Sequence, residues 1–246
     1  MKTLTLLFLL AAPAAAFDRS ELAELNDLYK NERYEEAYEG YAKVAAQEPA
    51  NPAGWYNAGN ALFRLNRQGE AVHSYAKAFR LAPRDADIRF NLEFALRQTG
   101  QTLVPDGVPR ALHALYFLFS DRELRTAVIL FFWLACLLGA AGFLLDGSPA
   151  ASKCAVGAVA AAALCAVSLA WAGARLTSPF SGGAVVVKQG GTRLLSGPGE
   201  NFKAYASAPE GQLVKILDDV DETYFEIGLT KEGIKGWAPR TDVKPI

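Results

Sequence analysis

Two long apolar segments place the strongest constraint on how this chain can fold. Residues 126–145 and 154–174 carry no charged side chain and flank the short connection 146–153. At ~1.5 Å of rise per residue, a helix of either length matches a hydrocarbon core of roughly 30 Å. Soluble helices of this length normally keep a polar stripe, which neither segment has. We therefore expect a transmembrane α-hairpin rather than a buried pair of core helices, with the alanine-rich second segment the less apolar.

Both apolar segments carry pairs of small residues four positions apart. Ala135 and Gly139 form one pair, and Gly157 and Ala161 form the other, so each pair lies on one helix face and lets a neighbouring backbone approach closely. Because no ionisable side chain lies inside either segment, nothing marks an ion or proton path. The pattern predicts an anchor rather than a transporter.

Composition excludes several classes of function. A net charge of −1 over 246 residues leaves no basic excess for nucleic acid. Cys136, Cys154 and Cys165 all fall in or beside the apolar segments, so the polar regions have no disulfide and no cysteine metal site. His73 and His113 are far apart in the sequence and predict no metal cluster. We expect no cofactor and no catalytic residues, because no nucleophile with a base, paired acid and base, or phosphate loop is present.

The N-terminus has the pattern of a secretory signal over residues 1–16. Lys2 precedes an apolar run and the small residues of the stretch 14–16, which predicts cleavage before Phe17. An uncleaved membrane helix is the alternative, but the run 3–16 covers only about 21 Å at the helical rise. A cleaved signal exports the region that follows it.

Residues 17–98 repeat themselves at a spacing of 34, which predicts stacked helix pairs. The recurring positions are Leu28, Ala37, Tyr41, Val44 and Pro49 in the first copy and Leu62, Ala71, Tyr75, Ala78 and Pro83 in the second. With Trp55 and Gly59 added, the second copy resembles the tetratricopeptide repeat, an all-α solenoid. The resemblance implies that Gly59 and Ala71 are small where the two helices cross, and that Tyr75 fills the wedge between repeats.

The flanking units depart from the repeat pattern. The first copy has Glu21 and Leu25 where the family prefers Trp and Gly, which predicts looser packing of its first helix. A third unit begins at Ala86 but lacks a second helix, so we expect it to cap the array.

In the linker and interfacial region 99–125, the aromatic stretch 109–119 is too short to span and is expected at the membrane interface. Beyond it, Ser120 and Glu123 form a capping box before the first span.

The C-terminal region 184–246 changes character after a tether at 176–183 that we expect to be flexible. Short β-prone runs separated by Gly, Pro and acidic turns predict a small antiparallel barrel. These runs are 184–188, 212–217, 223–229 and 233–239. Residues 193–199 (RLLSGPG) and the Lys235-Gly236-Trp237 stretch resemble the bacterial SH3 domain, which implies an SH3-like binding module.

Two features of this C-terminal region are candidates for binding. We expect Trp237 to pack partly into the core and partly along a surface cleft, since an indole combines an apolar face with one donor; burial in the core alone is the alternative. Four acidic residues, Asp218, Asp219, Asp221 and Glu222, lack the spacing of a calcium loop, so a solvated turn is favoured over a metal site.

The order of the parts makes this a multi-domain membrane protein. A signal, tetratricopeptide repeats, two spans and an SH3-like barrel, in that order, resemble the BatE type of protein from bacterial aerotolerance operons. The resemblance implies an envelope assembly of the bacterial inner membrane, with membrane-anchored von Willebrand factor A-type proteins and a MoxR-type ATPase as partners. We expect a noncatalytic adaptor with both modules on the periplasmic side. The alternative is a reader of peptidoglycan or peptides that acts through the SH3-like domain.

Charge near the spans opposes that orientation. The connection 146–153 carries one lysine, whereas four arginines flank the ends expected outside: Arg110, Arg122, Arg125 and Arg175. We favour the periplasmic placement because export of the first domain precedes insertion of the spans.

The concave face of the repeats is the predicted binding surface. Residues three or four apart on the first helix of each unit share a side. They are Asn26, Tyr29, Tyr56, Asn60, Phe63, Arg64, Phe90, Phe94 and Arg97. Amides beside aromatic rings suit an extended peptide, and Arg64 with Arg97 favours an acidic residue or a C-terminal carboxylate. Asn60 and Arg64 are expected to contribute little to a core.

Two observations limit this interpretation. Asn26 and Asn57 stand where chaperone-binding members of the repeat family clamp a carboxylate, but those members have Lys or Arg where this chain has Leu22, Asp87 and Asn91. The resemblance therefore does not imply a carboxylate clamp. The alternative for the rings of the groove is that they fill seams between helices.

Overall fold

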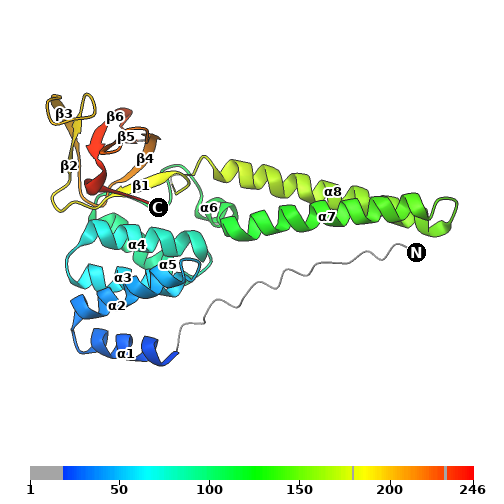
Figure 1. Ribbon diagram of the computed structural model, residues 1–246, viewed down its shortest axis with the longest axis horizontal. Coiled ribbons are helices and arrows are strands. Elements are labelled where there is room, and N and C mark those ends of the chain that lie inside the picture. The colour runs from blue at the N-terminus through cyan, green and yellow to red at the C-terminus, as the bar shows by residue number, and fades with distance from the viewer. Residues whose placement is uncertain (1–18, 179, 230–231) are drawn as a thin grey trace.

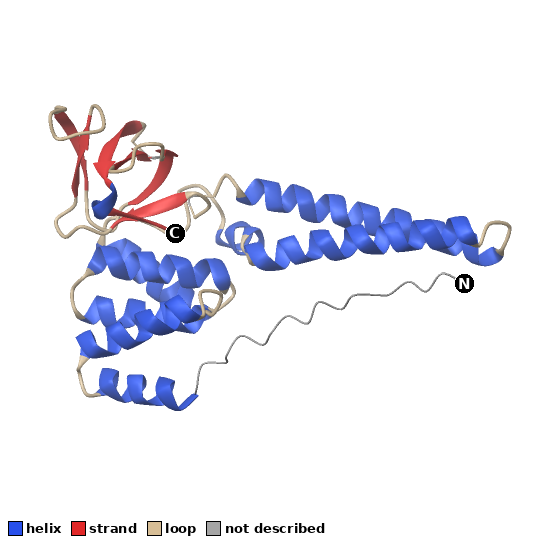
Figure 2. Cartoon of the chain, viewed as in Figure 1, coloured by secondary structure: helices blue, strands red, loops and turns tan. Residues whose placement is uncertain are grey.

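The computed structural model describes residues 19–178, 180–229 and 232–246, so the predicted signal lies outside the described residues. A stack of short helices lies against a β-sheet, and a long helical hairpin projects from the place where the two meet (Figure 1). Figure 2 shows the strands gathered in one part of the molecule, with one short helical turn among them.

The helical stack is built from two helix pairs and a fifth helix. These are α1 (Arg19–Lys30), α2 (Tyr34–Gln47), α3 (Pro52–Arg64), α4 (Gln68–Leu81) and α5 (Ala86–Gln98). The turns within the two pairs are alike, since Glu32 and Asn66, which are 34 positions apart, both have positive φ angles, of 61° and 58°. Local capping starts the later helices, because Asn51 accepts from the Ala53 amide and Asp85 from the Ile88 amide.

Close packing explains the small residues of the repeat. A Cβ at Gly59 would lie 2.7 Å from the Tyr75 ring, and Ala71 is fully buried, as the resemblance to the repeat implied. The first copy solves the same problem differently: Leu25 is buried, and a Cβ at Gly40 would lie 2.1 Å from its side chain. The larger residue at position 25 is therefore accommodated by a glycine on the facing helix.

A short helix leads into the hairpin. The elements are α6 (Arg110–Tyr116), α7 (Asp121–Leu144) and α8 (Pro149–Arg175). The predicted capping box is confirmed, since Ser120 and Glu123 bond reciprocally at the start of α7. At the other end, Arg175 lies 2.8 Å from Asp121, so the hairpin begins and ends at one point.

The two hairpin helices are long and apolar enough to cross a membrane. Within their most apolar windows, none of α7 and 6% of α8 is buried, which is unlike the core helices of a soluble protein. Gly157 allows close approach, because a Cβ there would meet Leu138 at 3.0 Å. Gly139 does not have this role, since nothing lies within 4 Å of a Cβ built on it.

The C-terminal region forms an antiparallel sheet of seven strands. They are β1 (Gly183–Val186), β2 (Thr192–Leu195), β3 (Ala204–Ala208), β4 (Leu213–Asp218), β5 (Tyr224–Leu229), β6 (Ile234–Pro239) and β7 (Val243–Pro245), with the 3₁₀ turn η1 (Arg240–Asp242) before β7. The order β3-β2-β6-β5-β4-β1-β7 leaves β3 and β7 as edges. The sheet is thus open, where the sequence predicted a closed barrel.

Three strands were missed by sequence patterning for a physical reason. The strands β2, β3 and β7 are short, and β3 is a run of small and polar side chains around Tyr205, so none has a strong alternating apolar pattern. Only one residue pair, Leu195 with Trp237, joins β2 to β6. Pairing with neighbours, rather than local propensity, holds these strands.

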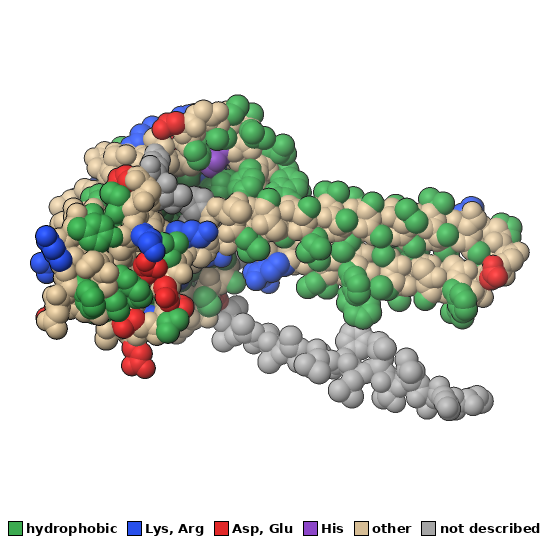
Figure 3. All heavy atoms as spheres, turned by 90° about the horizontal axis from the view of Figure 1, so that it is seen from above, with side chains coloured by type: hydrophobic (Ala, Val, Ile, Leu, Met, Phe, Trp, Pro, Cys, Tyr) green, Lys and Arg blue, Asp and Glu red, His purple; other side chains and the backbone are tan. Residues whose placement is uncertain are grey.

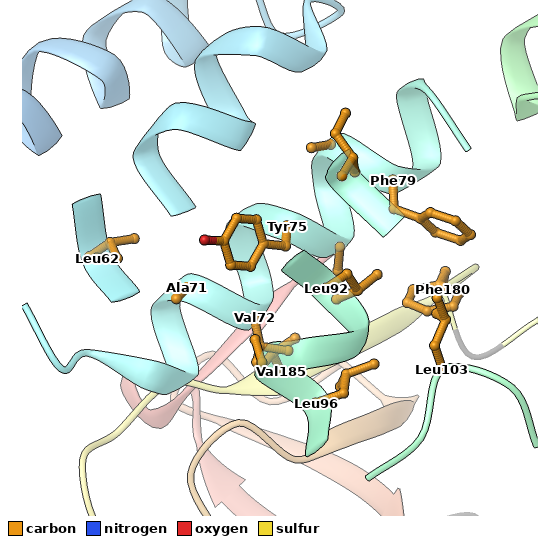
Figure 4. Packing of buried hydrophobic residues seen from close by; sticks show 14 of the residues in the cluster. Leu62, Ala71, Val72, Tyr75, Phe79, Leu92, Leu96, Leu103, Phe180 and Val185 are labelled. Atoms are coloured by element: carbon orange, nitrogen blue, oxygen red, sulfur yellow. The ribbon is translucent and has the colours of Figure 1, made fainter. Parts of the chain in front are cut away.

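The helical stack and the sheet share one apolar core. Val185 on β1 and Phe180 pack in the same cluster as Phe79 and Leu92 of the stack (Figure 4). Phe79 lies 5.3 Å from Phe180 and 5.0 Å from Phe117, ring centre to ring centre. The segment 176–183 is therefore not a flexible tether as predicted, because its Ser178 and Phe180 side chains are buried.

Polar contacts across the same interface are numerous. The Gly69 amide donates to the Glu210 carboxylate at 2.8 Å, and His73 Nε2 donates to the Pro245 carbonyl at 2.9 Å. Gln101 lies in the predicted linker. Its side chain donates to the Gly211 carbonyl and accepts from the Leu213 amide at the start of β4. These bonds fix the sheet on α4 and on the end of α5.

Candidate functional site

A hollow lies between the first helices of the repeats and α5, on the side of the stack that the sheet leaves uncovered. Its cavity volume is 220 Å³. The lining side chains are Tyr29, Asn60, Phe63, Arg64, Tyr75, Phe90, Asn91 and Phe94. We call this hollow the groove.

Hydrogen bonds hold the amides at the floor of the groove. Asn60 Oδ1 accepts from the Tyr75 hydroxyl at 2.8 Å and from Asn91 Nδ2 at 2.9 Å. Asn91 Nδ2 also donates to the Tyr56 hydroxyl at 3.1 Å. Burial raises the pKa of Tyr75, which keeps its hydroxyl protonated as a donor. Both bonds are on the oxygen of Asn60, and its Nδ2 amide has no hydrogen-bond partner among the described residues.

These bonds correct one expectation. Asn60 was expected to contribute little to a core, but its oxygen accepts from the buried hydroxyl of Tyr75. Loss of Asn60 would leave that hydroxyl without its acceptor, which lowers the free energy of unfolding. Arg64 fits the expectation better, because it is exposed and its guanidinium lies 4.9 Å from the Tyr34 ring centre.

Aromatic rings form the rim. Phe63 and Phe94 lie 5.6 Å apart, and Phe90 stacks on Phe94 at 6.4 Å with an angle of 14° between the rings. Phe90 is 63% exposed and Phe94 is 39% exposed. Rings this open contribute less to a core than buried ones, so the seam-filling alternative does not account for Phe90.

Three of the predicted groove residues lie elsewhere. Asn26 accepts from the Tyr41 hydroxyl at 2.6 Å, in the same way that Asn60 accepts from Tyr75. Tyr56 bonds to Asn91 without lining the cavity, and Arg97 lies 3.6 Å from Glu93 on the surface of α5. Arg64 is therefore the cation that lines the groove.

Two lining residues were missed by sequence reasoning. Tyr75 was assigned to the wedge between repeats, and Asn91 was noted only as a departure from the carboxylate-clamp pattern. The signal that identifies Asn91 is its position three residues before Phe94, which places an amide beside a ring on one helix face.

A second hollow lies beside Trp237 in the sheet. It has a volume of 610 Å³ and is lined by Pro198, Asp218, Val220, Asp221, Glu222, Thr223 and Trp237. Trp237 is half-buried, and it lies outside the apolar cluster of the sheet. Asp221 closes the acidic turn, because its Oδ1 accepts from the Thr223 amide, the Thr223 hydroxyl and the Tyr224 amide. The Thr223 amide bond is the largest cause of the lowered pKa of Asp221.

The two histidines and the acidic side chains are candidate metal ligands by residue type. Within the described ranges, no three His, Cys, Asp or Glu side chains come together as metal ligands do. Burial lowers the pKa of His73 to about 4 and also lowers that of His113, so both rings are neutral near pH 7. His73 is engaged in the contact between the stack and the sheet.

Comparison with known proteins bears on the helical stack. The geometry is that of a helical repeat with an open concave face. Residues 52–85, which span α3 and α4, match the tetratricopeptide repeat family. This is the second copy of the 34-residue repeat. No curated protein matches the sequence. Repeats of this family are typically noncatalytic modules for binding other proteins, so the match suggests a protein-interaction role for the stack, beside two helices long and apolar enough to anchor the chain in a membrane.

Proposed function

We propose that this chain is a noncatalytic, membrane-anchored adaptor whose groove binds an extended peptide segment of a partner protein. The observation that carries the proposal is the composition of the groove: Asn60, whose hydrogen bonds are made by its oxygen, lines the same hollow as the exposed rings of Phe90 and Phe94. An amide can hold a peptide backbone while the rings take its side chains.

Charge sets the kind of peptide. Arg64 is the cation at the groove, and its guanidinium can form paired, charge-assisted bonds with a carboxylate. Arg97 is paired with Glu93 outside the groove, so a second cation is not in place. We infer a preference for one acidic side chain within the peptide over a peptide without one.

The placement of the sheet supports an open binding face. The sheet covers α4 through Gly69 and His73, whereas the groove opens on the side of α3 and α5. Because the sheet also holds α4 rigidly, the groove is preorganised, which lowers the ordering cost of binding.

The experiment is a binding titration with the full chain in mild detergent. Fluorescent acidic peptides, and the same peptides with Glu and Asp changed to Gln and Asn, serve as probes in anisotropy measurements. Phe90→Ala combined with Arg64→Gln should weaken binding of the acidic peptides by about tenfold or more. Tenfold in affinity corresponds to a loss of about 1.4 kcal/mol of binding free energy. The matched control is Tyr205→Ala with Arg193→Gln, an exposed ring and an exposed cation on the sheet.

Two results would contradict the groove assignment. One is unchanged affinity in the groove variant; the other is equal loss in the control variant. The Asn60→Ala change is avoided, because it removes the partner of Tyr75 and confuses binding with folding. Co-purification in mild detergent followed by mass spectrometry then identifies the natural partner.

We further propose that the adaptor is part of a protein complex of the cell envelope. The order of parts that resembles BatE-type proteins supports an aerotolerance or stress role, with von Willebrand factor A-type membrane proteins and a MoxR-type ATPase as partners. Because Asp121 and Arg175 bring the two ends of the hairpin together, a spanning hairpin leaves the stack and the sheet on one side. We infer that this side is the periplasm. Alkaline phosphatase fused after Ile246 should be active, and an inactive, stable fusion would reverse the orientation.

The hollow at Trp237 favours a second function, as an SH3-like reader of peptidoglycan or peptides. A half-buried indole beside acidic side chains offers an apolar face together with acceptors for hydroxyl or ammonium groups. Pull-down on purified cell wall tests it: Trp237→Ala should abolish retention if the cleft is the reader, while the groove variant should not change it.

A further inference from the structure

A pocket at the root of the hairpin is separate from both hollows described above. It has a volume of 250 Å³ and lies between α4 and the first turn of α7, with the Trp55 indole on one wall. Its charged lining consists of Lys77, Arg80, Arg122, Arg125 and Asp121. Four cationic side chains therefore face one carboxylate side chain, and Arg80 also donates to the Ile246 backbone oxygen at 2.6 Å.

That carboxylate is already engaged. Asp121 lies 2.8 Å from the buried Arg175 and 3.4 Å from Arg80. Lys77, Arg122 and Arg125 have no carboxylate partner in the described part of the chain. The Lys77 ammonium instead lies 4.6 Å from the centre of the Trp55 ring. Burial, with Arg80 and Lys244 nearby, lowers the pKa of Lys77, as expected for a cation that lacks a counter-ion.

The position of the pocket points to its ligand. Arg122 and Arg125 share one face of α7, and Arg125 directly precedes the apolar run that begins at Thr126. A hairpin that spans a bilayer would thus hold these guanidinium groups at the depth of the lipid headgroups. Figure 3 shows Lys and Arg side chains where the hairpin meets the globular part, and hydrophobic side chains distributed along the hairpin beyond them.

We propose that this pocket binds the phosphate of an anionic phospholipid. Guanidinium groups from α7 and the ammonium group of Lys77 supply donors from two directions, and charge-assisted bonds to phosphate are the strong ones. Since Lys77 belongs to the stack and the arginines to the hairpin, the lipid bridges the two parts and sets the tilt of the groove above the membrane. The proposal rests on insertion of the hairpin and is independent of what the groove binds.

The test uses the full chain reconstituted in vesicles of equal parts phosphatidylcholine and phosphatidylglycerol. After extraction in mild detergent, native mass spectrometry counts the lipids that remain bound. Wild-type protein should retain phosphatidylglycerol in clear excess. Lys77→Gln with Arg122→Gln and Arg125→Gln should reduce that excess about tenfold or more, because each cation near an anionic surface contributes roughly a fivefold gain. The matched control is Arg193→Gln with Lys203→Gln and Lys215→Gln, three exposed cations of the sheet.

Each other outcome overturns the proposal. An unchanged excess in the triple variant removes the pocket, and equal loss in the control means that any surface cation serves. Displacement of the lipid by millimolar glycerol phosphate would show a site for a free phosphate ester instead. Should the triple variant misfold, Arg122→Gln with Arg125→Gln alone must still lose the preference, since both side chains are exposed. Resistance to carbonate extraction checks hairpin insertion separately.

Discussion

The Tyr75 hydroxyl donates to Asn60 Oδ1 at 2.8 Å, and 34 residues earlier the Tyr41 hydroxyl donates to Asn26 in the same way, at 2.6 Å. The repeat thus preserves a hydrogen bond as well as a packing pattern. In both copies it ties the second helix to the first helix of the same pair. Only the second bond lies at the floor of the groove, where Asn91 adds a further donor to the same oxygen.

Removal of this hydroxyl tests its structural contribution. Tyr75→Phe should lower the free energy of unfolding by about 1 kcal/mol, because the Asn60 oxygen keeps the bond from Asn91 and the ring keeps its packing. Thermal and chemical unfolding followed by circular dichroism measure the change. Tyr205→Phe, on the exposed edge strand, is the control and should be neutral. A loss in Tyr75→Phe no greater than in the control would show that the bond has no net stabilising effect.

Close approach of the sheet to α4 gives a second prediction. A Cβ at Gly69 would lie 2.5 Å from the Val186 carbonyl oxygen and 2.9 Å from the Val187 Cα atom, both backbone atoms that cannot turn aside. Gly69→Ala should therefore destabilise the docked sheet by roughly 1–3 kcal/mol. Hydrogen exchange should rise along β1 and at the Gly69 amide, with little change in α2.

An alanine substitution at the neighbouring position 68 serves as the control for Gly69→Ala. Gln68→Ala changes a residue in the same helical turn and removes only a long, 3.4 Å bond to Asn66. It should leave exchange along β1 unchanged. Equal exchange in both variants would mean that the sheet does not rest on Gly69.

The helical stack could be predicted because its signals are local and repeat. Ala71 and Tyr75 are buried in the second copy, and Ala37 and Tyr41 are buried 34 positions earlier in the first. The capping box at Ser120 is equally local. Patterns of this kind need no knowledge of the rest of the chain.

The docking of the sheet could not be predicted because its contacts join distant residues that look ordinary in isolation. Gln101 stands in a polar, turn-rich stretch, yet its side chain fills the place of a strand neighbour beside β4. From the sequence, Phe180 is predicted to be part of a tether. Only the structure shows that its ring packs against Phe79. The groove was predicted in part for the same reason: Phe63 and Phe94 follow from helix spacing, whereas the double bond on Asn60 depends on how α4 and α5 lean together.

Burial of His73 makes the docked state sensitive to acid. Its folded pKa of about 4 lies below the unfolded value of 6.5, so the unfolded chain binds the proton first as the pH falls. Stability should fall by about 2 kcal/mol between pH 7 and pH 5, before most carboxylates titrate. Lys77 and Lys244 nearby reinforce the lowered pKa, and Glu70 opposes it.

Thermal midpoints measured across that pH range check this prediction. His73→Gln keeps a donor for the Pro245 carbonyl but cannot titrate, so its midpoint should vary less with pH than that of the wild type. His113 also has a lowered pKa and will leave a smaller slope in the variant. Parallel curves for the two proteins would show that His73 does not contribute to the pH dependence.

The ion pair at the root of the hairpin gives the last prediction. Arg175 is 4% exposed; its guanidinium bonds to Asp121 and to the carbonyls of Tyr116 and Phe119, and its Nε atom is buried without a partner. Asp121→Ala leaves this cation buried without its counter-charge and should cost about 3–5 kcal/mol. Arg175→Met removes the charge while filling the space beside the Phe117 ring, so it should cost less.

Combining the two changes separates charge burial from lost contact. If the unpaired cation is the cause, Asp121→Ala with Arg175→Met should be more stable than Asp121→Ala alone, because the double variant buries no lone charge. Thermal unfolding of the full chain in detergent ranks the three variants. Additive losses would show instead that Asp121 acts through Arg80, its other partner at 3.4 Å, and that the buried arginine tolerates isolation.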